Sequence, residues 1–190
     1  MLKLIGFDAD DTLWHSEVYF RTAHDAFEMI LANYLDLSNI KVHEHLLDVE
    51  RRNIKLFGYG AKGMTLSMLE TAISITNERI SAKHLHEIIG LGKEVLLHPV
   101  SLIDGIEQAV KDIAKEYQVV LITKGDLFHQ ESKVAQSGLS PLFGRIEIVS
   151  EKDPATYQRV LSEFGLAAHQ FLMVGNSLRS DIAPVLQIGG

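Results

Sequence analysis

The sequence predicts an α/β fold in which a doubly wound parallel sheet carries a large helical insertion. Four short apolar runs of β-type residues predict the strands, at residues 2–7, 119–123, 146–149 and 171–174. These runs are apolar almost throughout, as expected for strands that are covered by helices on both faces. Amphipathic segments of helical period separate the last three runs, which gives the β-α-β-α-β order of a parallel sheet.

A long interval of purely helical patterning separates the first two strands. It runs from Glu17 to Leu97 and is broken near Ser38-Asn39, in the glycine-rich turn 58–63, and near Thr76-Asn77. Pro99 disfavours a helix at the preceding residue and suits the return of the chain to the sheet. The interval therefore predicts a helical insertion.

Helices of the sheet domain are predicted at residues 106–117, 130–136 and 155–164. Asp153 and Pro154 are typical of a helix start, since aspartate caps free N–H groups and proline fits the first helical position.

We expect residues 1–14 and 98–190 to form the α/β core, and residues 15–97 to form a helical cap. A doubly wound sheet would ordinarily continue after the helix near residues 182–186, whereas the sequence stops at Gly190. One or more C-terminal strands of the complete fold are therefore expected to be missing.

Composition excludes several classes of function. A hydrophobic content of 46% and a charged content of 23% are ordinary for a soluble protein, and no apolar run reaches the ~20 residues of a membrane span. The formal net charge of -7 argues against a nucleic-acid partner. Zero cysteine excludes disulfides, thiolate zinc sites and cysteine nucleophiles. The N-terminus lacks a secretory pattern, so we expect a cytoplasmic protein.

Polar side chains follow all four predicted strands where each strand ends. In chain order they are Asp8 and Asp10, Thr123 and Lys124, Lys152, and finally Asn176 and Asp181. Taken singly, each has an ordinary explanation as a turn or capping residue. Together they bring two acids, a hydroxyl, a cation and two more oxygen ligands to one edge of the sheet, where α/β proteins bind ligands. This combination suits a phosphate group and a hard cation such as Mg²⁺.

The segments DADDT, LITKG, the one around Lys152, and VGNSLRSD resemble the four ordered motifs of the haloacid dehalogenase superfamily. The resemblance extends from Leu4 to Asp181, and the helical insertion is similar to the cap that this superfamily carries at its first insertion point. It implies a magnesium-dependent phosphatase in which Asp8 becomes transiently phosphorylated. Asp10 would act as general acid and base.

The resemblance also implies roles for the other strand ends. Thr123 and Lys152 would hold the phosphoryl oxygens. The metal ligands would be Asp8, Asp10 through its main-chain carbonyl, Asn176 and Asp181. Many phosphatases of the superfamily carry aspartate where Asn176 stands, so weaker magnesium affinity is expected here. The dehalogenases carry no acid at the position of Asp10, since a departing halide needs no proton, and phosphoryl transfer is therefore favoured.

The substrate is expected to be a small phosphorylated metabolite. Candidate substrate contacts are Lys124, His15 beside the first motif, and Tyr59 and Lys62 in the glycine-rich turn of the cap. Two alternatives stay open: a phosphomutase that returns the phosphoryl group to its substrate, and a non-catalytic relative that only binds ligand. The oligomeric state is also open.

Overall fold

A computed structural model describes residues 1–38 and 40–190, which divide into two compact units. The first unit comprises residues 1–16 and 99–190, and the second comprises residues 17–98. The helical break expected at Ser38-Asn39 falls partly on residue 39, which lies outside the described residues.

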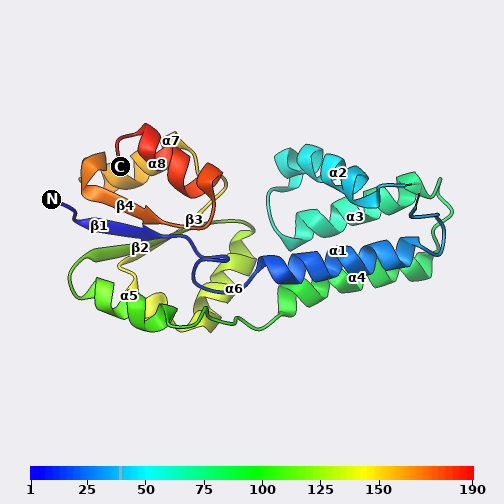
Figure 1. Ribbon diagram of the computed structural model, residues 1–190, viewed down its shortest axis with the longest axis horizontal. Coiled ribbons are helices and arrows are strands. Elements are labelled where there is room, and N and C mark those ends of the chain that lie inside the picture. Colours follow the sequence, from blue (N-terminus) through cyan, green and yellow to red (C-terminus); the bar gives the residue numbers. More distant parts are fainter. Residues whose placement is uncertain (39) are drawn as a thin grey trace. The chain divides into compact units, whose positions relative to one another are not determined.

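A four-stranded parallel sheet in the order β3-β2-β1-β4 forms the centre of the first unit (Figure 1). The strands are β1 (Leu4–Phe7), β2 (Gln118–Lys124), β3 (Arg145–Val149) and β4 (Phe171–Val174). Phe7 pairs with Leu121 on one side and with Val174 on the other, so the carboxyl ends of β1, β2 and β4 lie side by side. The predicted doubly wound parallel sheet is confirmed.

Helices cover both faces of this sheet because alternate strand residues point to opposite sides. One apolar cluster joins Phe7 and Leu121 to α5 (Ile106–Ala114) and α6 (Leu127–Ser137). A second joins Leu4 and Val120 to α7 (Pro154–Glu163) and α8 (Ala183–Gln187). Short turns complete the unit: η1 (Ser140–Leu142), η2 (Ala168–Gln170) and the π-helical η3 (Leu178–Ile182).

The predicted start of α7 is confirmed in detail. The Asp153 side chain accepts a hydrogen bond of 2.8 Å from the Thr156 N–H, and Pro154 occupies the first turn. The crossover helix α5 ends at Ala114, three residues earlier than predicted, because the chain tightens there: Lys115 N–H bonds to the Asp112 carbonyl, three residues back.

The second unit consists of α1 (Glu17–Leu31), α2 (Val42–Phe57), α3 (Ala61–Ile75) and α4 (Ala82–Leu97). The four helices bury a common apolar cluster that includes Phe27, Leu46, Met68 and Ile88. The glycine-rich turn is shorter than predicted, since α3 begins at Ala61 and Lys62 is therefore helical. Gly58 and Gly60 have φ angles of 73° and 111°, which glycine adopts without steric cost.

A polar contact joins α2 to α3 within this unit. Asn53, which is 6% exposed, donates hydrogen bonds to Ser67 Oγ at 3.2 Å and to Glu70 Oε2 at 2.8 Å. A buried amide left without partners would cost free energy, so this network favours one alignment of the two helices.

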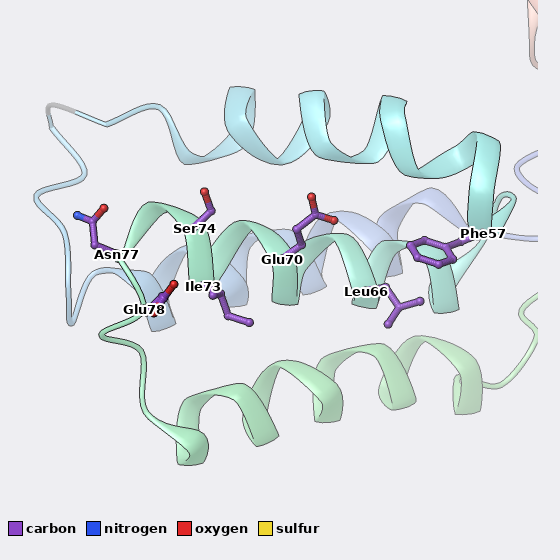
Figure 2. A pocket seen from close by; sticks show the side chains of 7 residues that line it. All are labelled: Phe57, Leu66, Glu70, Ile73, Ser74, Asn77 and Glu78. Atoms are coloured by element: carbon purple, nitrogen blue, oxygen red, sulfur yellow. The ribbon is translucent and has the colours of Figure 1, made fainter.

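A pocket of about 810 Å³ lies along α3 on the second unit (Figure 2). Its lining includes two carboxylates, Glu70 and Glu78, beside apolar side chains such as Phe57 and Leu66, and it includes no cationic side chain. A phosphate group would be repelled there, so the pocket does not suit a phosphorylated substrate. None of the described helices is both long enough and apolar enough to cross a membrane.

Candidate active site

The loop after β1 is fixed to the first unit by main-chain hydrogen bonds. Leu13 N–H donates to the Ala9 carbonyl at 2.8 Å, and His15 N–H donates to the Ser101 carbonyl at 3.0 Å. Asp11 adopts a left-handed φ of 58°, and its carboxylate accepts the Ser16 N–H at 2.9 Å. Aspartate tolerates this conformation because its side chain can bond locally. The loop therefore has a defined shape in which Asp8 and Asp10 are held in place.

Asp8 belongs to a buried cluster of three charged groups in which Lys152 lies between two carboxylates. Its Oδ1 accepts a hydrogen bond from Lys152 Nζ, and its Oδ2 accepts one from Thr12 Oγ1 at 3.1 Å. Lys152 Nζ also donates to Asp181 Oδ1 at 2.7 Å. Asp8 is 7% exposed, Lys152 3% and Asp181 1%, so two carboxylates share one ammonium group out of contact with bulk water. With all three groups ionised, the cluster carries one net negative charge.

The pKa of Asp8 is raised above its ordinary value of 3.8. Burial is the largest cause, since it disfavours the charged carboxylate. The Lys152 ammonium lowers the pKa and the Asp181 carboxylate raises it again. A carboxylate in this position gains from any additional cation that approaches it.

Asp10 is held quite differently, by three donors that all lie in the first unit. Its Oδ1 accepts the Trp14 indole N–H at 2.7 Å, and its Oδ2 accepts Gln130 Nε2 at 3.0 Å. Lys133 Nζ lies 2.6 Å from Oδ1 and 2.7 Å from Oδ2. Burial raises the pKa of Asp10, but the charge and hydrogen bonds of Lys133, with those of Gln130 and Trp14, outweigh it and lower the pKa below 3.8. The two acids of the first motif thus have opposite electrostatic environments.

The end of β2 contributes a hydroxyl and a cation. Thr123 is 1% exposed, and its Oγ1 accepts a hydrogen bond from Gln130 Nε2 at 3.0 Å, which leaves the hydroxyl hydrogen able to donate. Lys124 Nζ donates to Glu151 Oε1 at 2.9 Å and to Ser180 Oγ at 3.2 Å. Glu151 therefore offsets much of the charge that Lys124 could offer to an anion.

The end of β4 positions Asp181 through a tight turn. Asp181 Oδ2 accepts the Ser177 N–H at 2.9 Å, and Ser177 Oγ accepts the Ser180 N–H at 3.2 Å. Ser177, rather than Asn176, is thus the capping residue of η3. A side chain at Gly175 would overlap the Asp181 carboxylate, so only glycine permits this approach. Asn176 itself is exposed at the strand end.

The edge of the sheet offers oxygen atoms of the kind that a hard divalent cation binds. Within residues 1–38 and 40–190, no three carboxylate or imidazole side chains converge on one point. The available donors are instead the carboxylates of Asp8 and Asp181, the main-chain carbonyl of Asp10 and the side-chain carbonyl of Asn176. Oxygen ligands with a net negative charge are what Mg²⁺ prefers, although two carboxylates attract it less strongly than three would.

Several predicted residues lie together in the first unit, and others do not. Lys152 is in direct contact with both Asp8 and Asp181, and Gln130 joins Thr123 to Asp10. His15 is exposed. The other two predicted substrate contacts belong to the second unit: Tyr59 lines a pocket of about 350 Å³ there, together with Glu17, His24 and His43, and Lys62 is exposed on α3.

Four residues that contact the two acids were not singled out from the sequence: Thr12, Trp14, Gln130 and Lys133. Thr12 could have been recognised, since it is the last residue of the DADDT segment. Gln130 and Lys133 are three residues apart and therefore share one face of α6. That spacing marks them as neighbours, but it does not reveal that they reach Asp10.

The chain is similar to known proteins in both sequence and structure. The family model described as haloacid dehalogenase-like hydrolase matches residues 2–189. A haloacid dehalogenase-like family hydrolase from Xanthomonas campestris is 63% identical, with a TM-score of 0.95, and the match covers 100% of this chain and 79% of that one. A search of curated protein sequences gave no match.

Two more distant structures share the fold. The 2-haloacid dehalogenase from Pseudomonas syringae pv. Tomato DC3000 is 23% identical with a TM-score of 0.64, over 100% of this chain and 84% of that one. The haloacid dehalogenase-type hydrolase YfnB from Bacillus subtilis, whose structure is bound to magnesium, is 18% identical with a TM-score of 0.63, over 99% and 84% of the two chains.

Proposed function

Because the chain belongs to the haloacid dehalogenase-like hydrolase family, we propose that it is a magnesium-dependent phosphohydrolase acting on small phosphate monoesters through a phosphorylated Asp8. The observation that carries this proposal is the pairing of two acids with different surroundings. Asp8 is a buried carboxylate in contact with Lys152 and Thr12, and Asp10, two residues later, has a separate set of donors.

In the first step, an Asp8 oxygen attacks phosphorus and the bond from phosphorus to the ester oxygen breaks. Covalent catalysis of this kind divides one very slow reaction into two displacements. Lys152, already in contact with Asp8, offsets the negative charge on the phosphoryl oxygens. The Thr123 hydroxyl donates to one of those oxygens.

Asp10 takes part in proton transfer in both steps. In the first, the protonated form of Asp10, which its lowered pKa makes a minor form at neutral pH, gives a proton to the departing ester oxygen. In the second it accepts a proton from the water that attacks phosphorus, which releases phosphate and restores the Asp8 carboxylate. A departing halide needs no such proton, so the presence of Asp10 favours phosphate esters over haloacids as substrates.

Magnesium would be held by the carboxylates of Asp8 and Asp181, the main-chain carbonyl of Asp10 and the side chain of Asn176. When bound, it would neutralise negative charge on the phosphoryl group and on Asp8. Two observations support this assignment: the oxygen donors at the strand ends, and the magnesium bound in a relative of the same fold.

The experiment is a screen of phosphorylated metabolites with Mg²⁺, in which released phosphate is measured, and a parallel screen of 2-haloacids for released halide. We expect phosphate release by the wild type and none by Asp8→Asn, together with a phosphorylated peptide containing Asp8 in the quenched wild-type reaction. Halide release without phosphate release, or full turnover by Asp8→Asn, would contradict the proposal.

A second variant tests the role of Asp10. Asp10→Asn should lose ~100-fold or more in kcat with alkyl phosphates, the range typical of a lost general acid. The loss should be much smaller with an acyl phosphate, whose carboxylate leaving group needs little protonation. Equal losses with both substrates would remove Asp10 from the role of general acid toward the leaving group.

A further inference from the structure

We propose that Lys133 and Gln130, on one face of α6, are positioning residues that fix the Asp10 carboxylate in a single orientation. This inference rests on the proposed role of Asp10 in proton transfer, because a group that transfers a proton must be oriented toward its target.

Four hydrogen-bond contacts hold the Asp10 carboxylate, two to each of its oxygens. Trp14 and Lys133 donate to Oδ1, and Gln130 and Lys133 donate to Oδ2. Rotation of the carboxylate about its side-chain bond would break at least one charge-assisted bond, so the four contacts define one orientation.

Stability alone does not account for the ion pair. The Lys133 side chain is only 10% exposed and that of Asp10 is 28% exposed. Replacing a buried ion pair by apolar groups of similar size is often neutral or stabilising, because the charges no longer need to be dehydrated. A buried lysine that contacts the proposed acid and base of the reaction is therefore better explained by orientation than by stability.

Gln130 links Asp10 to the end of β2. Its Nε2 lies 3.0 Å from Asp10 Oδ2, 3.0 Å from Thr123 Oγ1 and 2.9 Å from the Lys124 carbonyl. Gly125 passes close beside this side chain with a φ of 152°, and a Cβ there would lie 3.0 Å from Gln130 Nε2. The amide thus sets the spacing between the proposed proton-transfer group and the proposed phosphate-binding hydroxyl.

The single tryptophan of the chain provides a direct readout of this orientation. Trp14 donates its indole N–H to Asp10 Oδ1 at 2.7 Å, so one indole signal in an ¹H–¹⁵N spectrum reports on the carboxylate. We expect Lys133→Met to move that signal and Lys133→Arg to restore most of it, because arginine can also donate two N–H groups to a carboxylate. Lys111→Met, on the partly exposed α5 pair with Glu107, is the matched control and should leave the signal in place.

Kinetics test whether the orientation serves the reaction. With an alkyl phosphate and saturating Mg²⁺, Lys133→Met should lower kcat by ~10- to 100-fold, part of the contribution of a general acid, while KM changes by less than about threefold. The loss should be smaller with an acyl phosphate. Lys133→Arg should recover most of the rate.

Gln130→Leu is an independent variant in case Lys133→Met does not fold. It removes the bonds to Asp10 and Thr123, and Gln136→Leu, at an exposed position of the same helix, is its control. Gln130→Leu should move the indole signal and lower kcat for the alkyl phosphate, whereas Gln136→Leu should do neither.

The outcomes separate this inference from the proposed function. An unchanged indole signal and unchanged ester turnover in the folded Lys133 and Gln130 variants would overturn the positioning role. If the wild type hydrolyses no phosphate ester and Lys133→Met still moves the indole signal, the proposed phosphatase function fails while Asp10 is shown to be held by Lys133.

Discussion

The raised pKa of Asp8 predicts a cost to the stability of the folded protein when no metal is bound. This pKa is raised, first by burial and then by Asp181, and the Lys152 charge only partly compensates. A carboxylate whose pKa is higher in the folded than in the unfolded chain loses free energy on folding when it is ionised. The proposed nucleophile is thus kept at a cost to stability.

We therefore predict that Asp8→Asn stabilises the protein without added metal. The amide removes one of two carboxylates that share a single ammonium, and the midpoint of thermal unfolding at neutral pH should rise by roughly 2–4 °C, the shift expected for ~1 kcal/mol in a chain of this size. Since the penalty exists only where Asp8 is ionised, the gain should vanish as the pH falls below 3.8, the ordinary pKa. Thermal unfolding measured across this pH range checks the sign.

Asp48→Asn is the control for this prediction, because Asp48 is exposed on α2 and its pairing with Arg51 is solvated. It should change the midpoint by less than Asp8→Asn at every pH. A lower midpoint in Asp8→Asn would contradict this prediction. It would mean that the attraction between Lys152 and the Asp8 carboxylate outweighs the repulsion between the two carboxylates.

Asn176 offers a second prediction at the residue scale. It is exposed at the end of β4 and does not cap η3, a role that Ser177 fills. If Asn176 is a magnesium ligand, Asn176→Asp adds a charge to the site and should lower the Mg²⁺ concentration for half-maximal activity by several-fold. Asp181→Asn should raise it.

Magnesium titrations of the three proteins check this prediction. Catalytic rate is a poorer observable, since a further negative charge would also repel the substrate phosphate. Superimposable titrations of wild type and Asn176→Asp would exclude Asn176 from the metal site.

At the scale of elements, the packing of α3 against α4 depends on one glycine. A side chain at Gly92 would overlap Thr65 Oγ1, and Thr65 cannot turn away freely because its hydroxyl donates to the Ala61 carbonyl at 2.6 Å. Glycine is otherwise unfavourable inside a helix, so its presence here reflects the close approach of the two helices.

Two alanine substitutions in α4 should consequently have opposite effects. Gly92→Ala should destabilise the second unit by ~1–3 kcal/mol through overpacking. Gly90→Ala, where nothing lies within 4 Å of the new methyl group, should stabilise it by up to about 1 kcal/mol through helix propensity. Chemical denaturation followed by helical circular dichroism would distinguish them, and equal effects would contradict the close contact with Thr65.

At the scale of the whole molecule, each unit has its own apolar core. One cluster lies entirely within residues 17–98, and the two clusters that cover the sheet lie entirely within the other unit. The first and last residues of the second unit also lie close together: Tyr19, near the start of α1, stacks on His98 with ring centroids 3.4 Å apart.

We predict that a peptide of residues 17–98 folds without the rest of the chain. It should be helical and unfold cooperatively on heating, since burial of one contiguous cluster supplies the driving force. Phe27→Ala removes a fully buried ring from that cluster and should abolish the cooperative transition. A non-cooperative loss of helix in the unmodified peptide would mean that the unit depends on the sheet unit.

The sheet and most of the proposed site could be predicted because their determinants are local. Apolar runs mark the four strands, and Thr123 lies in the last part of β2, whereas Asp8, Lys152 and Asp181 follow the ends of β1, β3 and β4. Parallel strands then bring those residues to one edge without further information. The predicted limits of the glycine-rich turn are wrong: the surrounding glycines place Lys62 in the turn, whereas α3 begins at Ala61.

By itself, then, the sequence determined the fold class, the order of the motifs and the residue types at the strand ends. Only the tertiary structure decided that Asp10 is bound by Lys133 and Gln130, and that Lys152 is shared between Asp8 and Asp181. The physical reason is that strand and helix patterns depend on neighbours in the chain, whereas these contacts join residues far apart in sequence. Their distances and burial, which set the two acids' opposite pKa shifts, exist only once the sheet and α6 have packed together.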